Sequence, residues 1–262
     1  MLKKIELILL ILLFSSPVVN GRPLRDGFGL WGVNGKVVRG DSNDMWLFEF
    51  DSEVNGDKGK IERGQKVKML RTSALEKMVS SDDEERVVKG YRIWGKVTQY
   101  KGRNYIYVIY FLSIIEVERI EEVKEEPNET KVKPLVNEPN DELSIPNNIL
   151  EKLKTKVIIR TEQLEKGFKL KQDMILADRT GFIVEKEDGG FEFELDALGR
   201  NIDGISFSLL PCQILERAEL KQGESLEKIR FKVAGTLTKY KDKNYLILQR
   251  ARRIYSHGNF PG

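Results

Sequence analysis

Apolar and polar residues alternate in several short segments of the first half of the chain, and this alternation predicts half-buried β-strands. After Thr72 and Ser73, either of which can cap a helix, the sequence 74–79 predicts a short helix. Lys101-Gly102 separates the last two alternating segments and predicts a hairpin turn. The expected order is therefore three strands, one helix and two strands. The strands are expected over 35–38, 46–50, 65–70, 92–100 and 104–113, and the helix over 74–79.

The same order of segments occurs a second time. Tyr91–Tyr105 matches Phe231–Tyr245, with Gly95 and Gly235 at equivalent positions 140 residues apart. Upstream, Trp46–Asp51 matches Phe191–Asp196 at an offset of 145. A repeat this long indicates two copies of a whole domain.

The predicted connectivity is that of the oligonucleotide/oligosaccharide-binding barrel, the OB-fold. The expected fold class is mainly β, with two tandem OB-fold-like small β-barrels, each with a short helix, joined by a flexible linker. Another small barrel or a half-open sandwich remains an alternative. The predicted parts are a signal peptide over 1–21, a first repeat over 26–118, a linker over 119–148 and a second repeat over 149–258.

Period-two alternation also assigns the faces of the hairpin strands. Ile93, Val97 and their counterparts are expected to face the core, and Gly95 and Gly235 to lie where a barrel strand bends or approaches another backbone. The residues expected to face outward are Thr98, Tyr100, Tyr105, Thr238, Tyr240 and Tyr245.

The N-terminus and the middle of the chain have compositions of their own. Lys3-Lys4 precedes the apolar run 7–14, which is followed by small and turn-forming residues, as in a secretory signal peptide. That run is shorter than the ~20 residues of a membrane-spanning helix, which argues against an uncleaved membrane anchor. No second long apolar segment follows, so the mature chain is expected to have no integral span. Residues 119–148 are rich in glutamate and contain four prolines, which predicts an extended, flexible tether. Because a signal peptide directs export, the protein is expected to be secreted or periplasmic.

Composition excludes several kinds of chemistry. The net charge is +3, too small to indicate a dedicated nucleic-acid protein. Cys212 and His257 are the only cysteine and the only histidine, so metal sites built from these residues are excluded. Cys212 lies among apolar residues and is expected to be buried rather than nucleophilic. We expect no catalytic residue, metal or cofactor, although a carboxylate-dependent hydrolase is not excluded by count.

Cationic and aromatic side chains meet at the two hairpin turns, where OB-folds can bind ligands. Together they suit stacking on bases or sugars and contact with anions. The alternative interpretation is that the lysines protect exposed strand edges and that the tyrosines pack on neighbours. The candidate ligand-binding residues are Tyr100, Lys101, Arg103, Tyr105, Lys239, Tyr240, Lys241, Lys243 and Tyr245.

The last strand of the first copy differs from its counterpart. Tyr105 to Leu112 is apolar on both faces, whereas the second copy has Gln249 and Arg250 in place of Ile109 and Tyr110. A strand that is apolar on both faces requires cover on both. Tyr105–Leu112 is therefore expected to form an intramolecular or an oligomeric interface.

The motif Gly-x-x-Thr-x-Tyr-x-x-x-Asn-Tyr, with Leu210-Pro211 and Leu215-Glu216 upstream in the second copy, resembles uncharacterised exported bacterial envelope proteins with tandem OB-fold-like repeats. The first copy departs from it at Leu70-Arg71. The resemblance implies location and fold and supplies no catalytic residue. The expected function is a non-enzymatic binding or assembly module of the cell envelope, with an unknown envelope protein or polymer as its partner. The alternative is a binder of anionic polymer, polysaccharide or nucleic acid, through the hairpin turns.

Overall fold

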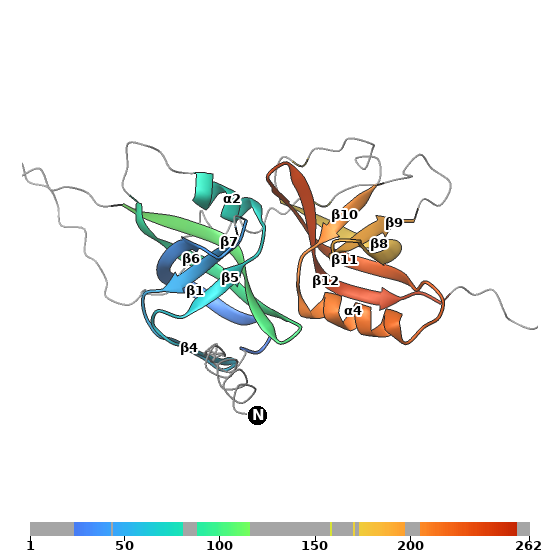
Figure 1. Ribbon diagram of the computed structural model, residues 1–262, viewed down its shortest axis with the longest axis horizontal. Coiled ribbons are helices and arrows are strands. Elements are labelled where there is room, and N and C mark those ends of the chain that lie inside the picture. Colours follow the sequence, from blue (N-terminus) through green and yellow to red (C-terminus); the bar gives the residue numbers. More distant parts are fainter. Residues whose placement is uncertain are drawn as a thin grey trace, which may run out of the picture.

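The computed structural model describes residues 24–42, 44–80, 88–115, 158, 170, 173–196 and 205–255. It contains two closed five-stranded barrels, which lie side by side in Figure 1. The expected fold class is confirmed. The predicted signal peptide and linker lie outside the described residues, as does His257.

Barrel one has its strands in the order β1-β2-β5-β7-β6, closed by pairing of β6 with β1. Only β5 and β7 run parallel, as neighbours far apart in sequence. The helix α2 follows β5, where the sequence predicts it, and Thr72 Oγ1 accepts a hydrogen bond from the Leu75 amide at 3.3 Å. The elements are β1 Phe28–Arg39, β2 Trp46–Phe50, β3 Val54–Gly56, β4 Gly59–Ile61, β5 Lys66–Met69, α2 Ser73–Ser80, β6 Val88–Tyr100 and β7 Arg103–Ile115.

Barrel two repeats this order as β10-β12-β11-β8-β9. Its helix α4 lies between β10 and β11, equivalent to α2 in barrel one. The elements are β8 Met174–Glu185, β9 Phe191–Leu195, β10 Ser206–Leu209, α4 Gln213–Gly223, β11 Arg230–Tyr240 and β12 Lys243–Arg253.

The two-stranded sheet β3–β4 has no counterpart in the predicted order of elements. Its strands are only three residues each, and Gly56 pairs with Gly59 across the turn. Ile61 at its end is fully buried, so this small hairpin closes one end of the barrel-one core. Strands this short give too few residues for an alternation pattern to be read.

The core assignments from alternation are confirmed. Ile93, Val97, Val233 and Leu237 are all fully buried. Gly95 lies at a register shift in β6, where a Cβ atom would come within 2.3 Å of the Tyr107 carbonyl oxygen. Gly235 has the same environment, 2.3 Å from the Ile247 carbonyl oxygen. Glycine is needed at both bulges because the neighbouring strand leaves no room for a side chain.

Candidate functional site

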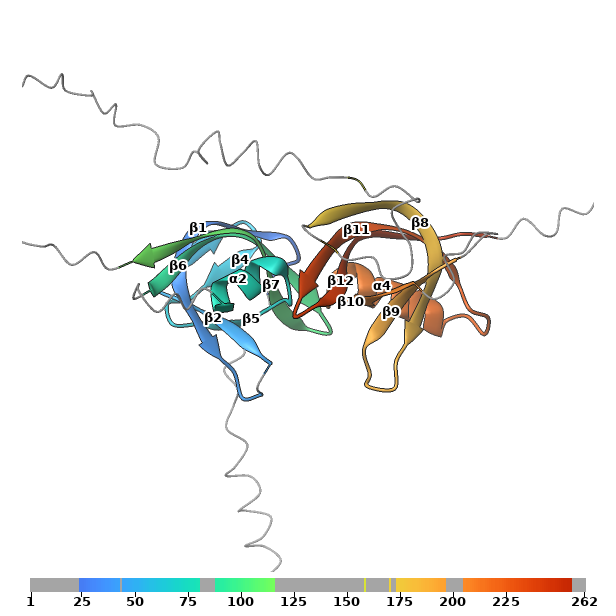
Figure 2. The ribbon, with the colours of Figure 1, turned by 90° about the horizontal axis from the view of Figure 1, so that it is seen from above.

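The hairpin turn of each barrel contacts the helix of the other barrel. In Figure 1 the β6–β7 turn reaches α4, and the β11–β12 turn reaches α2. The view from above in Figure 2 gives the same neighbours, with the two hairpins crossing between the barrels. The two hairpin turns, which the sequence predicts as ligand-binding sites, therefore lie at the contact between the two repeats.

The contacts are related by an approximate two-fold symmetry. The Ser73 amide donates to Thr238 Oγ1 at 2.9 Å, and the equivalent Gln213 amide approaches the equivalent Thr98 Oγ1 at 3.4 Å. Each threonine hydroxyl thus accepts a hydrogen bond from the first turn of the opposite helix, where backbone amides have no partner within the helix.

The turn residues follow the same symmetry. The Lys101 amide donates to Glu216 at 2.9 Å, and the Lys241 amide donates to Glu76 at 3.1 Å. Lys101 and Lys241 both adopt positive φ angles, 48° and 46°. The matched geometry means that one recognition surface is used twice, as in an isologous dimer interface.

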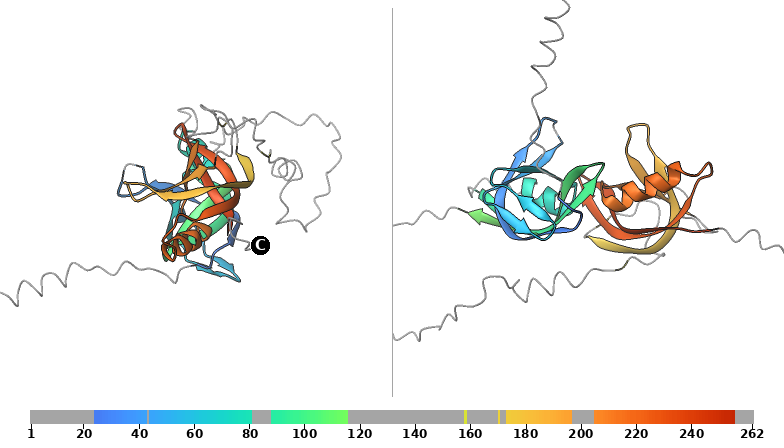
Figure 3. Two further views of the ribbon diagram at one scale, coloured as in Figure 1. Left: turned by 90° about the vertical axis from the view of Figure 1, so that its right-hand side faces the viewer. Right: turned by 90° about the horizontal axis from the view of Figure 1, so that it is seen from below.

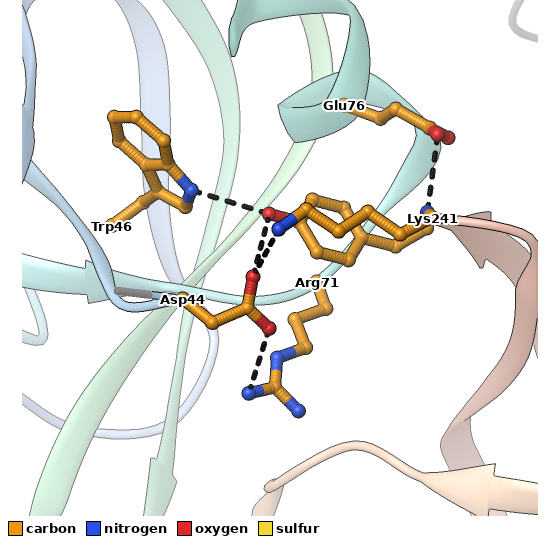
Figure 4. A network of polar contacts seen from close by, with 6 residues as sticks. Asp44, Trp46, Arg71, Glu76 and Lys241 are labelled. Carbon is orange, nitrogen blue, oxygen red and sulfur yellow. Dashed lines mark hydrogen bonds and ion pairs between the residues drawn. The ribbon is translucent and has the colours of Figure 1, made fainter. Parts of the chain in front are cut away.

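The side chains of Lys101 and Lys241 form ion pairs with carboxylates at different places in the fold. Lys241 Nζ lies 2.6 Å from Asp44, which precedes β2, and Arg71 lies 3.1 Å from the same carboxylate (Figure 4). The hydrogen bond from Lys241 is the main cause that holds the Asp44 pKa below its ordinary value. Lys101 Nζ instead pairs with Glu219 of α4 at 2.9 Å, which raises the lysine pKa.

The tyrosines beside the two turns lie at the contact between the barrels, Tyr240 buried and Tyr100 half-buried. Tyr240 is 2% exposed, and its hydroxyl accepts a hydrogen bond from Trp46 Nε1 at 3.2 Å. The Tyr100 hydroxyl donates to Glu219 at 2.5 Å, and burial, followed by that bond, raises the Tyr100 pKa to about 12. Burial of one large apolar side chain is worth ~1.5–3 kcal/mol, against ~0.2–1 kcal/mol for an exposed ion pair. Apolar burial therefore dominates the contact, and the polar pairs fix its register.

The outward assignment of these residues needs a correction. Thr98, Thr238 and Tyr240 face away from their own barrel but are 4%, 0% and 2% exposed. Tyr105 and Tyr245 are also buried, and Tyr105 packs against Tyr100 with ring centroids 6.4 Å apart. Alternation gives the side of a strand on which a residue lies but not whether a second domain covers that side.

The remaining candidate residues are distributed around the turns. Lys239 pairs with Asp242 at 2.8 Å within its own hairpin. Arg103 and Lys243 are exposed. The nine candidates therefore do not form one open site, because the contact between the barrels takes up the two turn lysines and their adjacent tyrosines.

The apolar strand of barrel one divides into two parts. Tyr105 to Val108 are buried, as expected of a strand covered on both faces. Ile109 and Leu112, in contrast, are 38% and 43% exposed, so no part of the same chain covers this end of the strand, and an oligomeric interface there stays a prediction. The buried part includes Tyr107, whose hydroxyl hydrogen-bonds with Thr236 of barrel two. The cover is intramolecular and ends where β7 passes beyond barrel two.

The described residues give little support for a metal site or a reactive thiol. Among them, no three His, Cys, Asp or Glu side chains gather where they could hold a metal ion. Cys212 is 2% exposed, and burial raises the pKa of its thiol, in agreement with the structural role expected for it. Across the same residues, no helix is long and apolar enough to span a bilayer.

Comparisons with protein-family models, curated proteins and solved structures found no match. Function therefore has to be argued from the surfaces of this chain. The resemblance to exported envelope proteins stays a prediction.

Proposed function

We propose that this protein is a non-enzymatic assembly module of the cell envelope, which associates with a second copy of itself through the outer end of β7. The two barrels form one rigid unit in this proposal. Their shared contact uses the hairpin turns, so the binding surface must lie elsewhere. The outer end of β7 is proposed as the binding surface because its strand edge is apolar and exposed.

The unpaired edge of β7 carries the proposal. β5 pairs with β7 only at Tyr105 and Ile106, so the following residues hydrogen-bond to β6 alone among the described strands. Asn104 to Ile115 contains no charged residue. An apolar strand edge without charges is a ready template for another strand. Because it carries no charge, it can also pair with a second copy of itself without repulsion.

The second barrel provides an internal comparison for this edge. Leu112 and Tyr110 correspond to Arg252 and Arg250 of β12, and charged residues on an edge prevent strand pairing. Two copies of β12 would bring arginines together, whereas two copies of β7 would bring together aliphatic and aromatic side chains. The fold tolerates either sequence, so the apolar residues of β7 are not required for barrel closure.

Exposed aromatic residues extend the apolar surface beside this edge. Trp31 of β1 is 65% exposed and lies opposite Trp94 of β6. Trp94 in turn lies opposite Tyr110, with ring centroids 5.4 Å apart. The equivalent positions of barrel two hold Ala177, Ala234 and Arg250. Contiguous exposed apolar surface of this kind marks interaction sites in soluble proteins.

Leu112→Arg, which copies the residue of barrel two, is expected to convert the protein to a monomer. An arginine would face its own copy across the symmetric contact, and like charges placed together cost several kcal/mol, or ~100-fold or more in the dimer dissociation constant. Light scattering of the full mature chain over a range of concentrations measures this change. A wild-type protein that is monomeric throughout that range contradicts the proposal.

Cysteine cross-linking identifies the strand involved. Leu112→Cys should give a disulfide-linked dimer, because antiparallel pairing about residue 112 brings the two cysteines opposite one another. The native Cys212 is buried and should not compete. Leu226→Cys is the control, since Leu226 is fully exposed on barrel two. Equal cross-linking of the two variants would argue against pairing at β7.

Export is tested separately by mass. The basic start, the apolar run and the small residues that follow predict removal of residues 1–21. Intact-mass measurement of protein recovered from the envelope fraction should give the chain beginning at Arg22. A mass that retains the first 21 residues would rule out cleavage there.

A further inference from the structure

Barrel two has a hollow of about 230 Å³ between α4 and the outer half of β12. Four of its lining residues are cationic, and they come from both elements: Arg217 and Lys221 from the helix, and Arg250 and Arg252 from the strand. The helix residues are four positions apart and share one face of α4. The strand residues are two apart and share one face of β12. We call these four residues the cationic groove.

Only part of the positive charge in the groove is neutralised by the protein. Arg250 forms an ion pair with Asp178, and Arg217 donates to Gln213 at 2.9 Å on its own helix. The side chains of Lys221 and Arg252 make no hydrogen bond or ion pair with any described residue. Glu216 and Glu219, the acidic residues in the middle of α4, contact barrel one instead. The groove therefore keeps an excess of positive charge.

A like-charge pair lies beside the groove. Lys232 of β11 is directly opposite Arg252 of β12, and both side chains are exposed. Like charges directly opposite one another destabilise a sheet. Neither side chain forms an ion pair with a described carboxylate. A bound anion would relieve this repulsion, so the arrangement favours a ligand with negative charge.

We propose that the cationic groove binds phosphate groups. Arginine and lysine side chains converge on it from two elements, and arginine presents a planar pair of donors that matches phosphate oxygens. The volume is below the ~300–1,000 Å³ of pockets for drug-sized ligands, which suits a single charged group of a larger molecule. The phosphate belongs either to a soluble polymer or to a lipid headgroup. This site is separate from the β7 edge, so either proposal can fail without the other.

The matched position in barrel one explains why only one barrel is assigned this site. Arg217, Arg250 and Arg252 correspond to Lys77, Tyr110 and Leu112. The same place between helix and last strand is thus mainly apolar in one barrel and cationic in the other. Barrel closure does not dictate either chemistry.

Inorganic polyphosphate is the first probe, measured by calorimetry against the mature full-length chain. Arg252→Gln and Lys221→Gln are each expected to weaken binding roughly tenfold or more, because each removes a charge-assisted hydrogen bond. Lys36→Gln is the matched control, since Lys36 is exposed and lies on β1 of barrel one, outside the groove. All three substitutions remove one surface charge, and unchanged melting temperatures confirm that the variants are folded.

The outcomes separate the groove from diffuse attraction. Weakening by the two groove variants with retention by Lys36→Gln supports the proposal. An equal loss in all three variants, or no binding by the wild-type chain to either probe, overturns it. The second probe is a set of phosphatidylglycerol vesicles, with phosphatidylcholine vesicles as reference. Groove-dependent binding to the anionic vesicles alone assigns a lipid headgroup, and binding to polyphosphate alone assigns a soluble phosphate polymer.

Discussion

Gly235→Ala is expected to destabilise barrel two and lower its melting transition while leaving that of barrel one unchanged. The new Cβ would lie 2.3 Å from the Ile247 carbonyl oxygen and 2.9 Å from a Leu246 methyl group. The first of these contacts is backbone in the adjacent strand of a closed barrel, so relief requires the β11–β12 bulge to open. Overpacking of this kind costs ~1–3 kcal/mol or more, a large part of the ~5–15 kcal/mol that stabilises a domain.

Gly223→Ala is the matched control for this substitution. Gly223 ends α4 in the same barrel, and a Cβ there would meet no atom within 4 Å. Gly95→Ala should produce the equivalent effect in barrel one, since its Cβ would lie 2.3 Å from the Tyr107 carbonyl oxygen. Calorimetry should resolve one lowered transition in each bulge variant and none in the control. An unchanged melting profile for Gly235→Ala would mean that the bulge is not tightly packed.

Lys101→Glu is expected to separate the two barrels. The substitution places a carboxylate beside Glu216 and Glu219, both of which contact Lys101 in the native chain. Two unit charges 4 Å apart repel by ~4 kcal/mol at an effective dielectric constant of 20, far more than the ~0.2–1 kcal/mol lost with an exposed ion pair. The residue lies at a positive φ angle of 48°, a strain that lysine and glutamate share.

The double substitution Lys101→Glu with Glu219→Lys should restore much of the contact. It reverses the ion pair and removes one of the two repelling carboxylates. Lys36→Glu is the control, because Lys36 is exposed on β1 and no hydrogen bond or ion pair between described residues joins its side chain to barrel two. Failure of the double variant to recover would assign the effect to the turn itself rather than to charge.

The internal repeat allowed the barrel cores to be predicted well. Gly95 and Gly235 occupy matched positions, and alternation around them placed Ile93, Val97, Val233 and Leu237 correctly in the core. The first strand was predicted only over 35–38, because Gly29 and Gly32 interrupt the apolar pattern of β1. Trp31 and the bulge after it also shift the register there, which alternation alone does not anticipate.

The contact between the barrels could not be predicted by the same means. Each of its hydrogen bonds joins residues of different copies, such as Ser73 and Thr238, which are 165 positions apart. Alternation reports one strand at a time, so it assigned Tyr240 to an open surface. The repeat did contain a hint: Glu76 and Lys101 recur as Glu216 and Lys241, and matched residues in two copies can pair across a two-fold axis.

The cationic groove was not predicted from the sequence. The sequence displays Arg250 to Arg253 as a cluster, but clusters of this kind are usually solvated surface. Arg217 and Lys221 join them only because α4 packs beside β12, which depends on the tertiary fold. Figure 3 gives two further views of the chain, in which α4 lies along the surface of barrel two beside β12.

We expect the two barrels to hold together by their own contact rather than by the linker. A site for a specific protease introduced within 119–148 allows the linker to be cut in the folded protein, after which gel filtration reports whether the halves separate. We expect the cut wild-type halves to elute together, the Lys101→Glu halves to elute apart, and the Lys36→Glu halves to behave as the wild type. Wild-type halves that separate on cutting would show that the linker, and not the contact, holds the barrels together.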